Sequence, residues 1–431
     1  MAHLVAGDSV ALACVLGARR HVTHGSKVRL SSAQQLAVIA CAAVLLERLL
    51  ALTLPTTWEW DAITRALQAY ALASDGPKEW FTSAPRVVWL PGMQAVQATA
   101  IAITGADPLV VGEWLSALAT GATAAYTVGL ARLAGAPTER RWVAAALLAT
   151  SGQALAYFSQ GMTEAFSVAA FVALIYHLLT ALRTGRRRHA GAAAVAWLLY
   201  ASTRWEGILL LGVLPVLLLS ALGPTWRAAF ARTWRLQLAM VTPAALFAAL
   251  FLAYSRWIDG AAFGAVSAVS THATETRWFK GAVLSDFGFM LIALLVTQGV
   301  LWVAAIPAAL RPSKVASAHG ESESSDAQEA ATRLLFGRLV VFQAVWFWCF
   351  LMLGLIYPSY RYLLVSLPLS AALVVSASWS ARTWRTVVLL SACVGAGVFG
   401  YHRYKHDEYM SGDPAHYEAR LNGGRWVRVR P

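Results

Sequence analysis

The sequence predicts an all-α membrane protein with about eleven transmembrane helices, given that a span needs about 20 apolar residues. Of its 431 residues, 58% are hydrophobic and only 13% are charged, whereas soluble chains carry about 25% charged residues. Apolar runs of spanning length recur along the chain, separated by short arginine clusters. The net charge of +13 lies in these clusters, which is the pattern of cytoplasmic loops and not of a nucleic-acid-binding surface.

The expected spans follow from these runs and from the arginines between them, which should stay on the cytoplasmic side. The N-terminus is then cytoplasmic and the C-terminus external. Glu47 and Arg48 fall inside the first span, where charges are costly, so they should face other helices. In order, the spans are 33–55, 112–133, 142–158, 165–183, 190–202, 208–222, 236–254, 287–310, 335–356, 363–378 and 387–400.

This topology divides the chain into three parts. Residues 1–32 form a cytoplasmic leader, 33–400 the transmembrane domain and 401–431 an external tail. The transmembrane domain carries external loops at 56–107 and 256–285. Its most polar segment, 311–333, is rich in Ser, Glu, Asp and Gln, which indicates a flexible cytoplasmic linker.

The first external loop should contain two short helices. Residues 61–73 have apolar side chains at helical spacing. Residues 93–104 are apolar but too short to span, so they are expected in the membrane interface.

An acidic motif stands at the start of that loop. Glu59 and Asp61 alternate with Trp58 and Trp60 directly after the first span. Tryptophans are common at membrane interfaces whatever the function, and carboxylates at helix ends are often solvated anchors. The motif alone therefore leaves open whether these acids do chemistry.

Other polar residues fall on the same predicted face. Glu164 precedes the fourth span, Arg204 and Glu206 lie between the fifth and sixth, and Arg361 follows the ninth beside Tyr357 and Tyr360. Arg204 and Glu206 could form an ion pair of small value, and Arg361 could reach for lipid headgroups. The coincidence of acids with arginines, whose forked donors grip phosphate, favours an active site.

Several function classes find no support in the sequence. No Gly-rich phosphate loop with a Lys is present, and no matching pair of Gly/Pro-broken helices indicates a secondary transporter. The four cysteines show no CxxC spacing. Two rivals stay open. A transporter or lipid flippase would use the acids as a relay near mid-bilayer, and a scaffold would not need them at all.

The order of these motifs resembles that of the GT-C superfamily of membrane glycosyltransferases, which includes protein O-mannosyltransferases and the lipid-A aminoarabinose transferase. The acidic motif follows the first span, Thr163-Glu164 opens the fourth, and an R-x-E-G motif begins at Arg204. Arg361 begins a late "RYLL" with a proline downstream at Pro368. The chain departs from its relatives in having Glu59-x-Asp61 as its acidic motif and no large C-terminal soluble domain.

The resemblance implies transfer of a sugar, mannose or another hexose, from a polyprenyl-phosphate donor to a hydroxyl of a glycolipid, glycan or protein. Transfer would invert the anomeric carbon at the external face of a bacterial plasma membrane, or of the endoplasmic reticulum in a eukaryote. Asp61 is the first choice for the general base and Glu59 the second, while Arg361 and Arg204 would hold the phosphate.

The remaining residues of this face, by the same resemblance, contact substrate: Glu164, Glu206, Tyr357, Tyr360, Trp58 and Trp60. No cofactor is expected. A divalent ion on Glu59, Asp61 and Glu164 stays an alternative, as in the oligosaccharyltransferase branch.

Overall fold

The structure is a computed structural model. It describes residues 31–53, 60–74, 90–159, 161–221, 234–259, 283–310, 323–353, 359–412, 418–422 and 425–429. The chain divides into two compact units, Met1–Gln35 and Leu36–Pro431. The second unit holds every helix and strand described except the first turn of α2.

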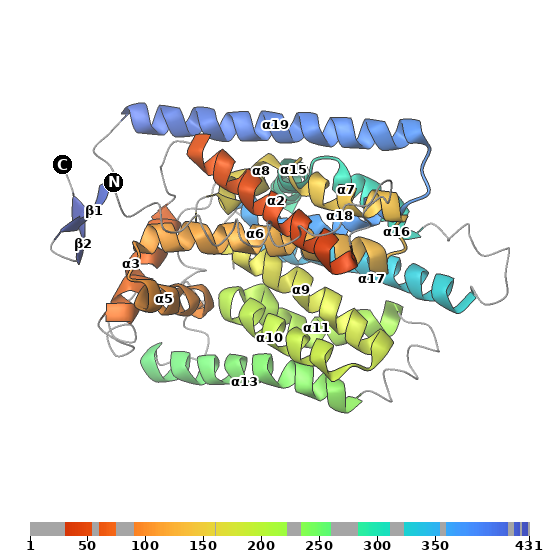
Figure 1. Cartoon of the computed structure of the whole chain (residues 1–431), viewed down its shortest axis with the longest axis horizontal. Helices are drawn as coiled ribbons and strands as arrows, with labels where there is room; N and C mark the ends of the chain where they lie inside the picture. Colours follow the sequence, from red (N-terminus) through yellow and green to blue (C-terminus); the bar gives the residue numbers. More distant parts are fainter. Residues whose placement is uncertain are drawn as a thin grey trace, which may run out of the picture. The chain divides into compact units, whose positions relative to one another are not determined.

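The described elements are helical apart from one small hairpin (Figure 1). The helices are α2 Ser32–Thr53, α3 Trp60–Ser74, α5 Gly92–Thr104, α6 Pro108–Leu133, α7 Thr138–Leu148, α8 Gly152–Phe158, α9 Thr163–Thr184, α10 Arg187–Thr203, α11 Trp205–Ala221, α13 Trp234–Asp259, α15 Val283–Gln298, α16 Leu301–Leu310, α17 Glu323–Met352, η1 Tyr360–Ser366, α18 Leu367–Ser376 and α19 Ala381–Gly412. The antiparallel strands β1 Glu418–Asn422 and β2 Arg425–Val429 lie in the tail.

The predicted class, an all-α multi-pass membrane protein, is confirmed. Five described helices are long and apolar enough to cross a membrane, or up to seven if each of two bent helix pairs counts as one span. The number of eleven spans stays a prediction. The five are Ala33–Leu50, Thr163–Thr184, Trp234–Trp257, Ala327–Met352 and Arg382–Tyr401.

Two of the predicted straight spans are broken helices. The span 287–310 bends by 92° between α15 and α16 at Gly299, whose φ of 58° suits glycine. The span 142–158 is divided into α7 and α8, and the Ser151 hydroxyl caps α8 by accepting from the Ala154 N–H. Each break falls at a few polar residues or glycines inside an apolar run of spanning length, so the run reads as one span.

Helix α9 is the centre of the packing. It lies beside α6 and α10, and α10 lies beside α13 (Figure 1). In the most apolar stretch of α9, 78% of the residues are buried inside the protein. Alanine-rich faces on α9 and α10 let the backbones approach, as is usual between membrane helices.

The segment 56–107, predicted to be an external loop, contains both predicted helices, α3 and α5. Helix α5 ends at Gly105, and Asp107 then caps α6 by accepting from the N–H of Leu109 at 2.8 Å. The chain bends by 116° between α5 and α6. At its other end, α5 begins against α10, where a Cβ on Gly92 would come 2.8 Å from the Ser202 carbonyl oxygen. This contact brings the loop to within two residues of Arg204.

Two predicted boundaries differ from the helices found there. Within the predicted linker 311–333, α17 begins at Glu323, and Thr332 and Arg333 are buried. They are buried because Arg183 donates to the Thr332 hydroxyl at 2.8 Å and Arg333 donates to the Ala134 carbonyl at 3.1 Å. Helix α19 likewise continues to Gly412, past the predicted end of the last span at 400.

Candidate active site

The first component of the site is the start of α9. A tight turn precedes it, in which Gly161 has a φ of 68°. This turn rests on α6, where the Ser116 hydroxyl donates to the Met162 carbonyl at 3.3 Å. The packing fixes Thr163 and Glu164 as the first residues of α9 and points Glu164 into the protein, with 1% of its surface exposed.

The second component is the junction of α10 and α11. Arg204 caps α10 with an extended backbone, and α11 begins at the next residue. Gly207 allows this sharp turn, because a Cβ there would come 2.5 Å from the Ala201 nitrogen. Trp197 secures the turn by donating to the Gly207 carbonyl at 3.1 Å. The R-x-E-G motif thus has a steric reason for its glycine and places Arg204 and Glu206 side by side.

The third component is η1, which carries Arg361 and Tyr362. Its backbone is held by two buried glutamines. Gln343 donates to the Tyr362 carbonyl at 3.1 Å, and Gln298 donates to the Leu363 carbonyl at 3.2 Å.

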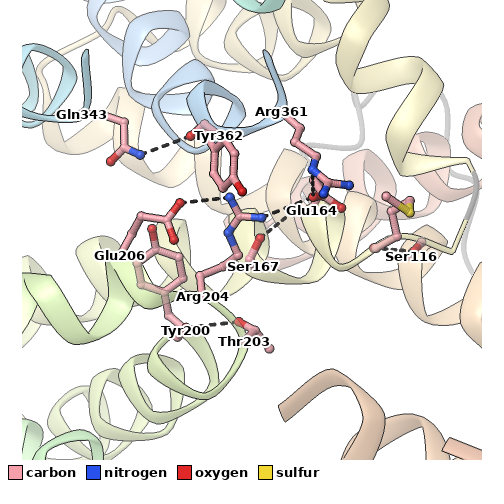
Figure 2. A network of polar contacts seen from close by, with 11 residues as sticks. Ser116, Glu164, Ser167, Tyr200, Thr203, Arg204, Glu206, Gln343, Arg361 and Tyr362 are labelled. Atoms are coloured by element: carbon pink, nitrogen blue, oxygen red, sulfur yellow. Dashed lines mark hydrogen bonds and ion pairs between the residues drawn. The ribbon is translucent and has the colours of Figure 1, made fainter. Parts of the chain in front are cut away.

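These components form one network of charges, shown in Figure 2. Arg204 lies between two carboxylates, 3.3 Å from Glu164 Oε1 and 2.9 Å from Glu206 Oε1. Arg361 Nε lies 3.5 Å from Glu164 Oε1. The exposed fractions are 8% for Arg204, 1% for Glu164, 4% for Glu206 and 16% for Arg361. Two positive and two negative groups balance, which is what makes burial of four charges tolerable.

Arg204 is the hub of this network. Its guanidinium also lies 4.7 Å from the centre of the Tyr362 ring, within reach of a cation–π interaction. Burial would lower the pKa of Arg204, but the charges of Glu206 and Glu164 outweigh burial and raise the pKa above its ordinary value. Arg204 is therefore a fixed cation.

Four buried polar atoms in or beside the network lack a hydrogen-bond partner among the described residues. They are Glu164 Oε2, Thr163 Oγ1, Tyr200 Oη and Arg204 Nε. Buried polar groups in proteins are nearly always satisfied, and exceptions commonly mark a water or ligand position. The site thus has unused hydrogen-bonding capacity next to fixed charges.

The structure brings together four of the residues that the sequence singled out: Glu164, Arg204, Glu206 and Arg361. Tyr360 neighbours them in sequence but stacks on Phe289, with ring centres 5.1 Å apart. The sequence reasoning did not name Thr163, Tyr200 or Tyr362 as site residues. Tyr200 could have been found by helical spacing, since it lies four residues before Arg204.

The acidic motif falls mainly beyond what the structure describes. Trp60 and Asp61 are the first residues of α3, but their side chains lie outside the description. Trp58, Glu59 and Tyr357 lie outside the described residues altogether. Helix α3 packs on α5 and α6, the helices that also reach the network.

A second group of charged residues lies near the start of α6, where Glu113 is close in sequence to Ser116. Arg48 on α2 lies 3.0 Å from Glu47 and 3.0 Å from Glu113 on α6, and 5.4 Å from the ring of Trp114. The interhelical pair explains how α2 carries two charges within an apolar segment. Across the described residues, no group of three or more His, Cys, Asp or Glu side chains could hold a metal ion.

Comparison with known proteins finds similarity in structure alone. No family model and no curated protein matches the sequence. The crystal structure of ArnT from Cupriavidus metallidurans bound to undecaprenyl phosphate matches with a TM-score of 0.53 at 15% identity, and its apo state with a TM-score of 0.51. The chain therefore shares the fold of these two ArnT structures over the matched region. The match covers 83% of this chain and 63% of ArnT.

A third solved structure is more distant. The Archaeoglobus fulgidus oligosaccharyltransferase, in complex with Zn and sulfate, has a TM-score of 0.41 at 12% identity. That match covers 82% of this chain and 53% of the oligosaccharyltransferase.

Proposed function

We propose that this protein is a glycosyltransferase that moves a sugar from a polyprenyl-phosphate donor to a hydroxyl acceptor. The observation that carries the proposal is the buried network of Glu164, Arg204, Glu206 and Arg361 with its unsatisfied carboxylate oxygen. Such a site offers preorganised positive charge and polar contacts within an apolar protein, as transfer from a lipid phosphate requires. The fold shared with ArnT, and the undecaprenyl phosphate bound to ArnT, support this donor class.

The two arginines have different parts in the proposal. As the bond between the anomeric carbon and the phosphate oxygen breaks, its electron pair moves to the phosphate, which needs a cation beside it. Arg361 is the more exposed arginine and takes this role. Arg204 lies deeper between two carboxylates, so it holds Glu164 and Glu206 in place and adds positive charge behind Arg361.

The acceptor hydroxyl needs a base at the same time. Asp61, at the start of α3, is the proposed base, and Glu59 is the alternative. The base removes the hydroxyl proton while the oxygen attacks the anomeric carbon from the side opposite the phosphate. One displacement of this kind inverts the configuration of the sugar. A base typically contributes about 10²–10⁴ in rate.

The proposed active site faces outside the cytoplasm. It lies at the first turn of α9, whereas Arg183 lies in the last turn and the arginines 186–188 follow it. The positive-inside rule places those arginines in the cytoplasm. We favour a bacterial plasma membrane, a hexose such as mannose as the sugar, and a glycolipid, glycan or protein as the acceptor. Tyr360, Tyr357, Trp58 and Trp60 are proposed to line the substrate path, and no cofactor is needed.

The test is a transfer assay with purified protein in lipid nanodiscs. A panel of undecaprenyl-phosphate sugars is supplied with membrane lipid extract as acceptor, and products are read by mass spectrometry. We expect Asp61→Asn to lower the rate by about 10²-fold or more, with expression and melting temperature unchanged. Near wild-type turnover in this variant would remove Asp61 as the base.

Two controls complete this assay. Glu139→Gln neutralises an exposed acid near the start of α7 and should leave transfer unchanged. Excess EDTA should also leave transfer unchanged, and a loss that Mg²⁺ or Mn²⁺ restores would overturn the metal-free mechanism. If no donor in the panel reacts, the proposed function is wrong, and a transporter or flippase becomes the better reading of the same charges.

A further inference from the structure

Glu164 is bound in an unusual way for a buried carboxylate. Both arginines approach the same oxygen, Oε1, at 3.3 Å and 3.5 Å. Charge-assisted hydrogen bonds of this kind are normally about 2.7–2.9 Å long, the length that Arg204 achieves with Glu206 at 2.9 Å. The other oxygen, Oε2, is buried and has no hydrogen-bond partner in the described part of the chain. Glu164 is therefore held only by long contacts to Oε1, and its Oε2 makes no hydrogen bond to a described residue.

The contact between Arg361 and Glu164 also differs from the rest of the network in its exposure. Arg361 is the most exposed of the four charged residues, and Glu164 is the most buried. Figure 2 shows Arg361 reaching Glu164 from η1, from a different direction than Arg204 does. An anion that binds Arg361 would contact the same guanidinium group that the Glu164 carboxylate already contacts.

Electrostatics makes these two anions competitors. The four residues have no net charge, so an incoming phosphate adds an uncompensated negative charge near Glu164. Like charges about 4 Å apart repel strongly at the effective dielectric constant near a protein surface. Phosphate binding is favourable only if Arg361 turns toward the phosphate and gives up part of its interaction with Glu164.

We infer that Glu164 competes with the phosphate of the lipid donor for Arg361, so that binding exchanges one anion for the other. This inference rests on the proposed function, because it assumes a lipid phosphate as ligand. After the sugar has left, return of Arg361 to Glu164 promotes release of the lipid phosphate product. Glu164 is thus a positioning residue that limits phosphate affinity and keeps the product from blocking the site.

The distinguishing prediction is a gain of affinity. Glu164→Gln keeps the shape and a hydrogen-bond acceptor for Arg204 but removes the competing charge. Loss of one competing charge-assisted contact corresponds to about tenfold in affinity, which is about 1.4 kcal/mol. We therefore expect Glu164→Gln to bind undecaprenyl phosphate about tenfold more tightly than the wild type does, with a slower off-rate and a lower kcat.

The matched control is Glu206→Gln. It removes a carboxylate of equal charge from the same network, but from Arg204 and not from Arg361. Its gain in affinity for undecaprenyl phosphate should be clearly smaller than that of Glu164→Gln, because Glu206 contacts Arg204 and does not occupy Arg361. In the double variant Glu164→Gln/Arg361→Gln, the gain should disappear because the contested cation is gone.

The measurement is a binding titration of full-length protein in nanodiscs with undecaprenyl phosphate, and with undecaprenol as the lipid without phosphate. If the wild type does not distinguish these lipids, the proposed donor class itself is wrong. If the wild type binds the phosphate but Glu164→Gln binds no more tightly, or Glu206→Gln gains equally, the exchange is wrong while the proposed function survives. Should Glu164→Gln fail to fold, Glu164→Asp shortens the side chain away from Arg361 and must shift affinity in the same direction.

Discussion

The two ends of α9 use arginine for different purposes. At its start, Arg204 and Arg361 meet the carboxylates of Glu164 and Glu206, all mostly buried. At its end, about 30 Å away at 1.5 Å per residue, Arg183 donates to the Leu133 carbonyl at 3.0 Å and to the Thr332 hydroxyl.

The acceptors explain the difference. Leu133 is the last residue of α6 and Ala134 caps it, and the carbonyls at a helix C-terminus lack intrahelical partners and attract cations. Arg183 and Arg333 therefore complete α6 and attach α17 to it, which is a structural task. The charges at the start of α9 cap no helix in this way and leave Glu164 Oε2 unsatisfied. Arginines that donate to helix-end carbonyls here have a structural role. Arginines that contact buried carboxylates with an unsatisfied oxygen indicate a binding or active site.

The largest expected effect in this comparison comes from Arg204→Met. Removing the hub leaves Glu164 and Glu206 buried without their main counter-ion. Breaking a buried ion pair from one side typically costs about 3–5 kcal/mol, so the folded fraction should fall sharply. Thermal unfolding in detergent, followed by size-exclusion chromatography, measures this loss.

The triple variant Arg204→Met/Glu164→Gln/Glu206→Gln separates charge from shape. Replacing a whole buried ion cluster by neutral groups is often nearly neutral for stability. We expect most of the lost stability to return in the triple variant, but no sugar transfer. A triple variant as unstable as Arg204→Met would show that packing of the Arg204 guanidinium, and not charge balance, stabilises the contact of α9 with the junction of α10 and α11.

The sequence could reveal the network because its four charged residues stand at the ends of apolar runs. Alternation of the spans brings those ends to one face, so Glu164, Arg204, Glu206 and Arg361 could be grouped without coordinates. Tyr200 lies one helical turn before Arg204, so spacing could have indicated it. Thr163 opens an apolar helix, and its role depends on the side chains across the interface, which the sequence does not show.

The breaks in the helices were hidden for a related reason. The bend of 92° lies at Thr297-Gln298-Gly299, a dip too short to divide an apolar run of spanning length, and Gly299 has the conformational freedom for a φ of 58°. The start of α17 shows the reverse error. Residues 323–333 look like a polar linker by composition, but Ala, Glu and Gln favour helices. Contacts from Arg183 and from Arg333 to α6 then fix that helix in place.

An intermediate effect is expected at the structural end of α9. Arg183→Met removes hydrogen bonds to the Leu133 carbonyl and the Thr332 hydroxyl, which should cost about 1–3 kcal/mol in the free energy of unfolding. Sugar transfer per folded molecule should stay at the wild-type rate. Arg187→Met, at an exposed position in the first turn of α10, is the control and should change stability by less than about 0.5 kcal/mol. Lost transfer in well-folded Arg183→Met would show that the two ends are coupled.

The smallest expected effect tests the turn that presents those carbonyls. Gly135 follows Ala134 with a φ of 81°, where an alanine pays about 1–2 kcal/mol in backbone strain. A Cβ there would also displace the carboxylate of Glu329, which can move because it is the end of a flexible side chain. Gly135→Ala should therefore lower the free energy of unfolding by about 1–2 kcal/mol and leave transfer unchanged.

The matched glycine for this test is Gly191. It is exposed inside α10, and a Cβ there meets no atom within 4 Å. Gly191→Ala should stabilise the protein by about 0.5–1 kcal/mol, because alanine loses less conformational freedom in a helix. The two substitutions add the same methyl group and should have opposite signs. If both substitutions destabilise the protein equally, the positive φ of Gly135 is not the reason that a side chain there is unfavourable.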